Sequence, residues 1–468
     1  MQQAALASAG LLLADKALAT GYNEFPRVRV TAGLRKFSSP AVEALIEEIK
    51  KQVPNKELAW LFENCFANTL DTTVDFEIID GKPDTFVITG DIDAMWLRDS
   101  SAQVWPYLPL MKADPELQQL IKGVINRQVK CILKDPYANA FYKDESRISE
   151  WKDDKTLMKP GVHERKWEID SLCYPIRLAH GYYRHTQDAT VFDAAWQQAM
   201  KLVIQTFTEQ QRLESPGPYT FQRTTSWATD SVPLGGTGYP TKKTGLIHSM
   251  FRPSDDAAIF PFLIPSNLFA RQELQHLQFI FAEVLRDPAM LSAIKKLSDR
   301  LEAGLKNITV QHPVYGKVYP YETDGFGNHS FMDDANVPSL LSLPYLTDFI
   351  KNTDPTYINT RKMILSDSNP FFFKGKAAEG VGGPHVGLDY IWPLSITMRG
   401  LTSMNLTEIK KCLQLLQTTH AGSGFMHESF HKDDATKFTR KWFAWANTLF
   451  GEFVWKVYRD HRELLRGL

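Results

Sequence analysis

The feature that most constrains the fold of this chain is a succession of amphipathic segments that runs along almost its whole length. Apolar residues recur in them at helical spacing, as in Leu117, Leu120, Ile121 and Val124, which predicts helices with one buried face. Strand-like alternation is rare, and its clearest case is a predicted β-hairpin over residues 74–88 that turns at Asp80 and Gly81. The predicted helices cover residues 40–50, 56–68, 115–134, 167–185, 189–211, 266–284, 288–306, 337–349, 355–365, 388–401, 406–418 and 445–465.

The number and order of these helices predict an all-α fold. Helices in consecutive pairs must bury their apolar faces against neighbouring pairs, and pairs that close on themselves form an (α/α)6 toroid of helical hairpins. An open helical solenoid is the alternative, since helix count alone does not close a ring. Long loops rich in Gly, Pro, Asp, His and aromatic residues separate several pairs, and loops of this length are usually functional. They cover residues 215–261, 315–334, 371–384 and 421–440.

The amino terminus resembles an export signal. Residues 1–20 hold an apolar stretch from Met1 to Ala14 and a small-residue processing site from Ala17 to Ala19, although no basic region precedes the apolar stretch. We therefore expect a signal-peptide-like segment at 1–20 and export, to a bacterial periplasm. An amphipathic terminal helix is the alternative. No low-complexity linker follows, so residues 36–468 are expected to form one catalytic domain without a membrane span.

Composition narrows the possible partners. The formal net charge of −1 over 468 residues offers no electrostatic footprint for nucleic acid. The aromatic fraction is 12%, with 11 Trp and 28 Phe, and several of these rings stand beside charged residues. This mixture suits sugars, whose C–H faces pack on rings while their hydroxyls bond to charged groups. The four Cys are widely spaced and predict neither a disulfide framework nor a metal cluster.

The densest polar segment runs from Thr89 to Trp105. Buried polar groups at this density must bond to one another or to a ligand. Asp91 and Asp93 are suited to accept hydrogen bonds from sugar hydroxyls, Arg98 to donate in a fork, and Trp96 to cover a sugar face. A structural ion pair between Arg98 and Asp99 is the alternative for those two residues.

Two further segments carry carboxylates that could act in catalysis. Asp255 and Asp256 follow Pro253 and precede an apolar run, where they serve either as catalytic groups or as favourable partners of a helix dipole. Glu428 lies in a polar loop after a Gly-Ser-Gly turn, where it is either a general base or a solvated surface residue.

The string from His427 to His431 matches the HExxH pattern of zinc proteases. That pattern requires a continuous helix that presents both His on one face. Here turn-forming residues flank the string on both sides and leave little room for such a helix. A zinc-dependent hydrolase is therefore an alternative function, and we expect neither a metal nor any other cofactor.

The sequence resembles glycoside hydrolase family 125, whose members are exo-acting α-1,6-mannosidases with an (α/α)6 fold and an inverting mechanism. Five motifs carry the resemblance, and they are spread from about Lys36 to the carboxyl end. They read TGDIDAMWLRDSSAQVWPYLPL, FRPSDDA, FMDDANVPSLL, HVGLDYIWPLS and GFMHESFHKDD.

The resemblance implies roles for the residues in these motifs. Inversion needs a protonated acid beside the leaving oxygen and a carboxylate base about 6.5 to 9.5 Å away that activates water. By resemblance the acid is Asp255, with Asp256 as the open alternative, and the base is Glu428. The residues implied to bind the terminal sugar are Asp91, Asp93, Trp96, Arg98, Asp99, Arg252, Asp256, Asn336 and His385.

The expected function is therefore the release of terminal mannose from α-1,6-linked mannosides or N-glycan-type mannans. The expected partner is an α-mannoside glycan, with no nucleic acid and no membrane span. Besides the zinc hydrolase, a helical protein that binds glycans without cleaving them is an alternative.

Overall fold

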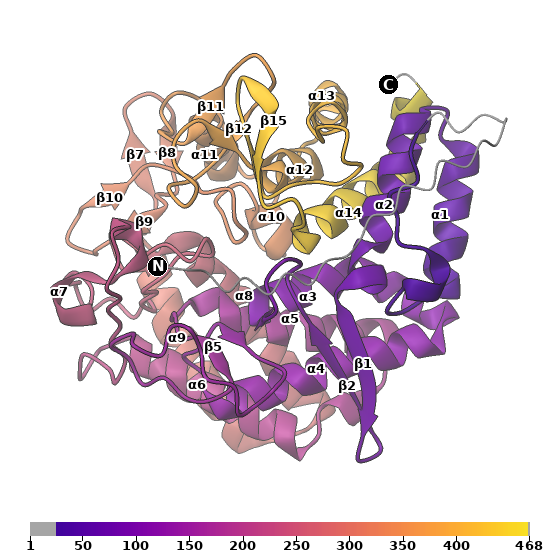
Figure 1. The fold of residues 1–468 in the computed structure, drawn as a ribbon. Coiled ribbons are helices and arrows are strands. Elements are labelled where there is room, and N and C mark those ends of the chain that lie inside the picture. The colour runs from indigo at the N-terminus through magenta and orange to yellow at the C-terminus, as the bar shows by residue number, and fades with distance from the viewer. Residues whose placement is uncertain (1–24, 467–468) are drawn as a thin grey trace, which may run out of the picture.

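The computed structural model describes residues 25–466 as a ring of helices with small two- and three-stranded sheets in the segments that connect them (Figure 1). The signal-like segment predicted at residues 1–20 lies outside the described residues. The helices are α1 (Pro40–Gln52), α2 (Lys56–Thr72), α3 (Leu97–Val104), α4 (Pro115–Lys134), α5 (Ile169–Thr186), α6 (Ala194–Gln210), α7 (Pro233–Gly236), α8 (Ile264–Phe279), α9 (Pro288–Leu305), α10 (Leu343–Leu346), α11 (Pro355–Ile364), α12 (Pro393–Leu401), α13 (Leu406–Thr418) and α14 (Ala444–Asp460).

An inner ring is formed by α3, α5, α8, α10, α12 and α14. Along the ring α3 packs against α5, α5 against α8 and α8 against α10, while α12 packs against α14. The ring closes because α14, from the end of the chain, also packs against α3. This contact confirms the predicted toroid and excludes the open solenoid.

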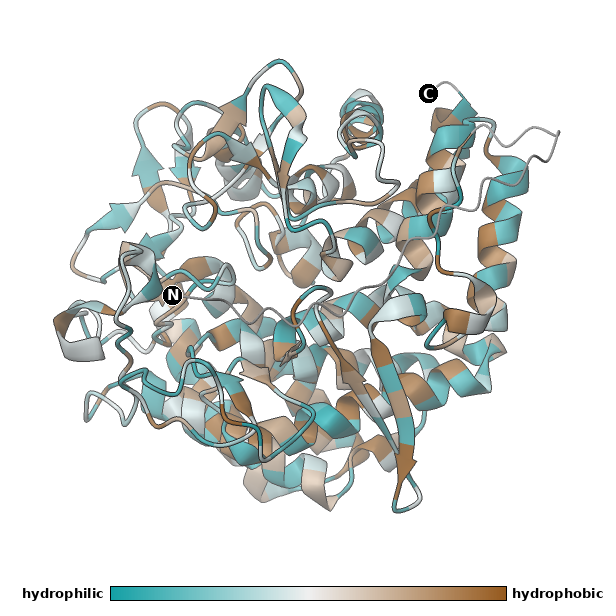
Figure 2. Cartoon of the chain, viewed as in Figure 1, coloured by the Kyte–Doolittle hydropathy of each residue, from teal (hydrophilic) through white to brown (hydrophobic). Residues whose placement is uncertain are grey.

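The remaining long helices form an outer layer. α9 and α13 each pack against the inner helix that precedes them, α4 packs against α6 and α6 against α9, and α2 covers α14. These helices are amphipathic, as the alternating brown and teal stripes of Figure 2 show. In α1, for example, Val42, Ile46 and Ile49 are buried while Glu47 and Lys51 are exposed.

The helices begin at residues that favour a helix N-terminus. Ser39 accepts a hydrogen bond from the backbone N–H of Val42 at 3.2 Å and Pro40 occupies the first turn, as predicted. The predicted hairpin is also confirmed, with β1 (Val74–Ile79) antiparallel to β2 (Lys82–Val87).

Short strands lead the chain into the inner helices. β3 (Met95–Trp96) ends directly before α3, and β6 (Phe262–Leu263) ends directly before α8. β13 (Tyr390–Ile391) ends directly before Trp392, the N-cap residue of α12. Their sheets hold distant loops together at the N-terminal ends of these helices. The partners are β4 (Ala140–Phe141) and β5 (Val162–Glu164) for β3, β9 (Glu322–Thr323) and β10 (His329–Ser330) for β6, and β14 (Ser429–His431) and β15 (Asp434–Thr439) for β13; two further hairpins pair β7 (Val310–His312) with β8 (Gly316–Val318) and β11 (Phe372–Lys374) with β12 (Glu379–Val381).

The helix predicted at 337–349 is wrong except for one turn, α10. Pro338 and Pro344 lack the N–H that a helix uses, and the backbone N–H groups of Leu340 and Leu341 donate to the carboxylate of Asp333, at 2.8 and 3.0 Å. The helix predicted at 388–401 likewise begins only at Pro393, because β13 occupies the residues before it.

Candidate active site

A cavity of about 560 Å³ lies at the N-terminal ends of the inner helices. Every inner helix is preceded by residues that line it, so segments far apart in the sequence converge there. Helix N-termini carry partial positive charge, which favours the carboxylates gathered at this end. The lining includes Trp96, Arg98 and Asp99 from the start of α3, Lys166 before α5, Asp255 and Asp256 before α8, Asn336 before α10, His385 and Trp392 before α12, and Glu428 and Arg440 before α14.

Arg98 is the centre of a buried cluster of carboxylates. Its Nη1 lies 2.6 Å from Glu168 Oε2 and 3.1 Å from Asp170 Oδ2, and its Nη2 lies 3.5 Å from Asp255 Oδ1. Asp99 Oδ2 lies 3.4 Å from Arg98 Nε, so the pair considered from the sequence does form, within a larger network. Burial raises the pKa of Asp99 to about 6, against the opposing effect of Arg98.

Asp255 and Asp256 are neighbours in sequence but point to different partners. Asp255 has a positive φ of 66°, unusual for a residue with a side chain, in a turn where its N–H donates to the carbonyl of Arg252. Its Oδ1 accepts a hydrogen bond from Asn139 Nδ2 at 3.2 Å, and its side chain is 20% exposed. The Asp256 side chain is only 2% exposed, so Asp255 is the more open of the two to the cavity.

The charges around Asp255 favour its ionised form. Burial acts to raise the pKa of Asp255, but Arg98 and Lys166 outweigh it and bring that pKa well below its usual value. Lys166 also fixes the backbone here, because its Nζ donates to the carbonyl oxygen of Asp255 at 3.0 Å and pairs with Asp230 at 2.6 Å.

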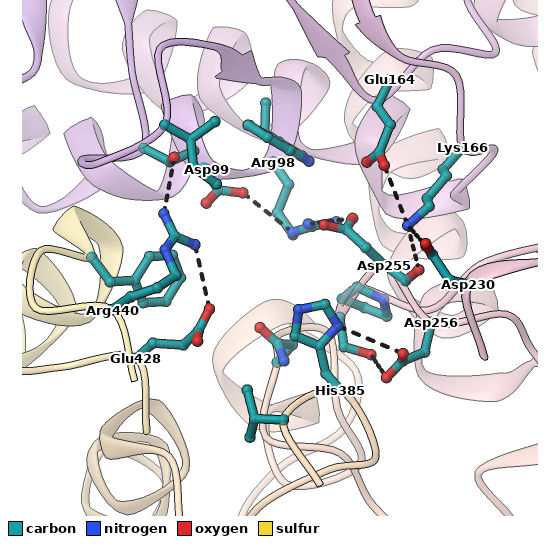
Figure 3. Close-up of a pocket in the computed structure, with 18 of the residues that line it drawn as sticks. Arg98, Asp99, Glu164, Lys166, Asp230, Asp255, Asp256, His385, Glu428 and Arg440 are labelled. Atoms are coloured by element: carbon teal, nitrogen blue, oxygen red, sulfur yellow. Dashed lines mark hydrogen bonds and ion pairs between the residues drawn. The ribbon is translucent and has the colours of Figure 1, made fainter. Parts of the chain in front are cut away.

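Glu428 lies on the other side of the cavity from Asp255, as Figure 3 shows. Its Oε2 accepts a hydrogen bond from Thr439 Oγ1 at 2.9 Å, and its Oε1 lies 3.4 Å from Arg440 Nη1. Thr439 ends β15, which pairs with β14 directly after Glu428, so a local sheet orients this carboxylate.

His385 lies between Glu428 on one side of the cavity and Asp256 on the other (Figure 3). Its Nδ1 is 3.6 Å from Asp256 Oδ1, which also accepts a hydrogen bond from Thr229 Oγ1 at 2.7 Å. Burial acts to lower the pKa of His385, but the hydrogen bond and charge of Asp256 raise it to about 9. The imidazole is therefore a cation at neutral pH and can donate to a ligand.

Aromatic rings complete the lining. Trp96, Trp392, Phe443 and Trp445 lie in or beside the segments that carry the charged groups. Flat rings beside fixed carboxylates and cations match the two kinds of surface that a sugar presents.

Three residues expected to bind the sugar do not line this cavity. Asp91 is 40% exposed and accepts hydrogen bonds from Arg440, at 2.6 Å from Nη2 and 2.9 Å from Nε. Asp93 is 76% exposed and pairs with Arg147 at 2.9 Å. Arg252 is buried and pairs with Glu322 at 2.6 Å, where it holds β9 against the turn before α8.

Other lining or supporting residues were not singled out from the sequence. Glu164, Lys166, Glu168 and Asp170 come from one charged stretch directly before and within the start of α5. This stretch is as rich in charged residues as the Thr89 to Trp105 segment, and that density could have identified it as part of the site. Arg440 carried no such signal, because only the fold brings it to Glu428.

The HExxH string does not form the helix of a zinc site. Residues 429–431 are strand β14, and in an extended chain residues four apart are separated by about 13 Å. His427 stacks on the ring of Phe438, with centroids 3.7 Å apart. No group of three His, Cys, Asp or Glu side chains able to hold a metal occurs among residues 25–466.

Comparison with known proteins relates this architecture to glycosidases. A solved structure described as a glycosidase aligns with a TM-score of 0.53 over 86% of this chain and 99% of that chain; at 11% identity this shows a shared fold alone. Residues 55–455 match the sequence model of the family described as metal-independent α-mannosidases. The chain belongs to this family, glycoside hydrolase family 125.

Two relatives extend the comparison. A structure from Streptococcus pneumoniae, described as a metal-independent α-mannosidase in a non-productive complex with α-1,6-mannobiose, is 40% identical with a TM-score of 0.86, over 91% of this chain and all of that chain. The meiotically up-regulated gene 157 protein of the fission yeast Schizosaccharomyces pombe is 42% identical over 96% of this chain and 91% of its own length.

The fission yeast relative overturns the expected location. A bacterial periplasm was inferred from the amino-terminal segment alone, and a eukaryotic relative of this similarity contradicts it. Among residues 25–466 no helix is long and apolar enough to cross a membrane.

Proposed function

We propose that this α-mannosidase-family protein is an exo-acting, inverting α-1,6-mannosidase. The observation that carries the proposal is the placement of Asp255 and Glu428 on opposite sides of one cavity, each held by its own partners (Figure 3). Two carboxylates that face a bound sugar from opposite sides can act as acid and base in a single displacement.

Asp255 is the proposed acid and Glu428 the proposed base. Asp255 protonates the oxygen of the leaving sugar, and Glu428 takes a proton from a water that attacks the anomeric carbon from the other face. Thr439 and Arg440 hold Glu428 in one orientation, which lowers the entropic cost of aligning the water.

The α-1,6 linkage is supported by the mannobiose bound to the Streptococcus pneumoniae protein, which covers nearly the same sequence range. Removal of terminal sugars is supported by the position of the cavity above the inner helices, which begin at the cavity and pack beneath it. Arg98, Asp99, Asn336 and His385 then bind the terminal mannose, with Trp96 against its apolar face.

The test compares α-1,6-, α-1,3- and α-1,2-linked mannobiose, each incubated with enzyme treated with EDTA. The proposal expects mannose release, fastest from the α-1,6 isomer and unchanged by the chelator. A trimannoside labelled at its reducing end should lose unlabelled mannose first. Binding without release from any isomer would favour the non-catalytic glycan-binding protein, and release from the labelled end would contradict exo action.

A further inference from the structure

Glu168 is a buried carboxyl group that the proposed mechanism does not yet use. It immediately precedes α5, and its side chain is fully buried. Its Oε2 accepts hydrogen bonds from Arg98 Nη1 at 2.6 Å and Ser171 Oγ at 2.7 Å. Its Oε1 is buried and receives no hydrogen bond, although a buried acceptor without a partner is costly.

Glu168 and Asp255 lie against the same guanidinium, with Glu168 Oε2 2.6 Å from Arg98 Nη1 and Asp255 Oδ1 3.5 Å from Arg98 Nη2. Two carboxylates this close to one guanidinium repel one another, and neither can donate a hydrogen bond while both are ionised. A proton held between them removes the repulsion and satisfies the unpartnered oxygen.

The surrounding charges also favour such a proton. Arg98 is one guanidinium facing four carboxyl groups, those of Asp99, Glu168, Asp170 and Asp255. The nearby cation Lys166 is shared with two further carboxylates, Glu164 at 3.4 Å and Asp230 at 2.6 Å. Burial raises the pKa of Glu168 well above its usual value, and Asp255 and Asp170 add to this effect while Arg98 opposes it. Protonation of Glu168 at neutral pH lowers the number of uncompensated negative charges in this buried cluster.

We propose that Glu168 and Asp255 share one proton, and that Glu168 is the positioning residue that keeps this proton available to the acid. Glu168 itself is too deeply buried to touch the substrate, whereas Asp255 reaches the cavity. The inference rests on the proposed function, because it assigns the source of the proton that Asp255 delivers.

The reaction balances with this pair. The shared proton moves onto Asp255 and from there to the glycosidic oxygen as the bond from that oxygen to the anomeric carbon breaks. Water forms the new bond to that carbon and gives its proton to Glu428. The pair then carries two negative charges, and it regains a proton from solvent while Glu428 releases one.

Asp170 provides a matched control. It is also fully buried, its Oδ2 also accepts a hydrogen bond from Arg98 Nη1, and its Oδ1 also lacks a partner. In the proposal it holds no part of the shared proton. Asp170→Asn therefore removes a buried charge from the same cluster without removing the shared proton.

The kinetic test uses Glu168→Gln, which keeps the shape of the side chain and donates to Asp255 through its amide without a proton to transfer. For α-1,6-mannobiose, the basic limb of the kcat/KM profile should move to lower pH by about one unit or more, with a loss of about tenfold or more at pH 7. For an aryl α-mannoside with a dinitrophenolate leaving group, which needs no protonation, the loss should stay below about threefold. Asp170→Asn should affect both substrates by similar factors without moving the basic limb.

An equal loss on both substrates with an unmoved basic limb in Glu168→Gln would overturn the proposal, since that is the result of structural damage alone. Unchanged kinetics would overturn it as well.

A second measurement does not depend on turnover or on the identity of the substrate. Infrared difference spectra at pH 7 between the substrate-free wild type and Glu168→Gln should show the carbonyl band of one protonated carboxyl group that the variant lacks. Asp255→Asn should lose the same band, and Asp170→Asn should keep it. Mannose release without this band would overturn the shared proton, whereas the band without mannose release would leave the shared proton standing and remove the proposed substrate.

Discussion

Nη1 of Arg440 lies 3.4 Å from Oε1 of Glu428, and this contact joins the loop before α14 to the proposed base. Arg440 also holds Asp91 at 2.6 Å, so one guanidinium connects the base to the segment that leads into α3. The side chain of Glu428 is 6% exposed and that of Asp91 is 40% exposed, so water screens the contact with the base less than the contact with Asp91.

Replacing Arg440 should therefore slow the reaction more than it weakens binding. We expect Arg440→Ala to lower kcat by roughly 10- to 100-fold with a smaller change in KM, because Glu428 loses a partner that fixes its orientation. Steady-state kinetics with a mannoside measure this. Arg147→Ala is the control, since Arg147 pairs with the exposed Asp93 and should change kcat by less than about twofold. An equal effect of both substitutions would contradict the assignment.

Asp93 and Asp99 come from the same motif but differ in position. Asp99 is 6% exposed beside Arg98, whereas Asp93 is 76% exposed. Asp99→Asn should lower kcat/KM by roughly 100-fold, because a buried charged acceptor for sugar hydroxyls is lost, and Asp93→Asn should change it by less than about twofold. A large effect at Asp93 would mean that the substrate extends beyond the described cavity.

The pair of His385 and Asp256 makes stability depend on pH. Because the pKa of His385 rises from about 6.5 to about 9 on folding, its stabilising contribution is complete below about pH 6.5 and is lost as the pH rises through 9. The free energy of unfolding in urea should therefore differ more between wild type and His385→Gln at pH 6 than at pH 9.5. A difference that grows with pH would show that the imidazole is neutral in the folded protein.

The packing of the outer helix α2 on the inner helix α14 depends on a close approach of their backbones. A Cβ added at Gly451 would lie 2.6 Å from the ring of Phe66 and 2.9 Å from its Cα. Gly451→Ala should lower the free energy of unfolding by about 1–3 kcal/mol, because the backbone of α2 cannot give way freely. Gly33→Ala, where no atom lies within 4 Å, is the matched control and should leave it nearly unchanged. Urea unfolding curves of both variants decide the matter.

The sequence was informative where local chemistry decides the structure. The cap at Ser39, the hairpin from Val74 and most long helices follow from residue spacing, and their number led to the toroid. Helix α3 was missed because its buried residues include Arg98, Asp99 and Ser100, which hide the apolar period. Around Pro338 a helix was predicted that does not form. The apolar residues there have helical spacing, but the backbone N–H of Leu340 donates to the side chain of Asp333.

Only part of the candidate site could be predicted from the sequence. Motifs identified the segments that reach the cavity, but the contacts between those segments depend on the fold. Asp256 was left open as the alternative acid, and its carboxylate accepts hydrogen bonds from Thr229 and Ser254, whereas Glu168, which no motif indicated, lies with Asp255 against Arg98. Only the packing of α5 against α3 and α8 brings Glu168 to Asp255.

The most direct test of two-carboxylate inversion follows the anomer of the first mannose released from α-1,6-mannobiose, by proton NMR before mutarotation. The account predicts β-mannose first, with release lost or strongly reduced in both Asp255→Asn and Glu428→Gln. Early α-mannose, or undiminished release by either variant, would contradict it.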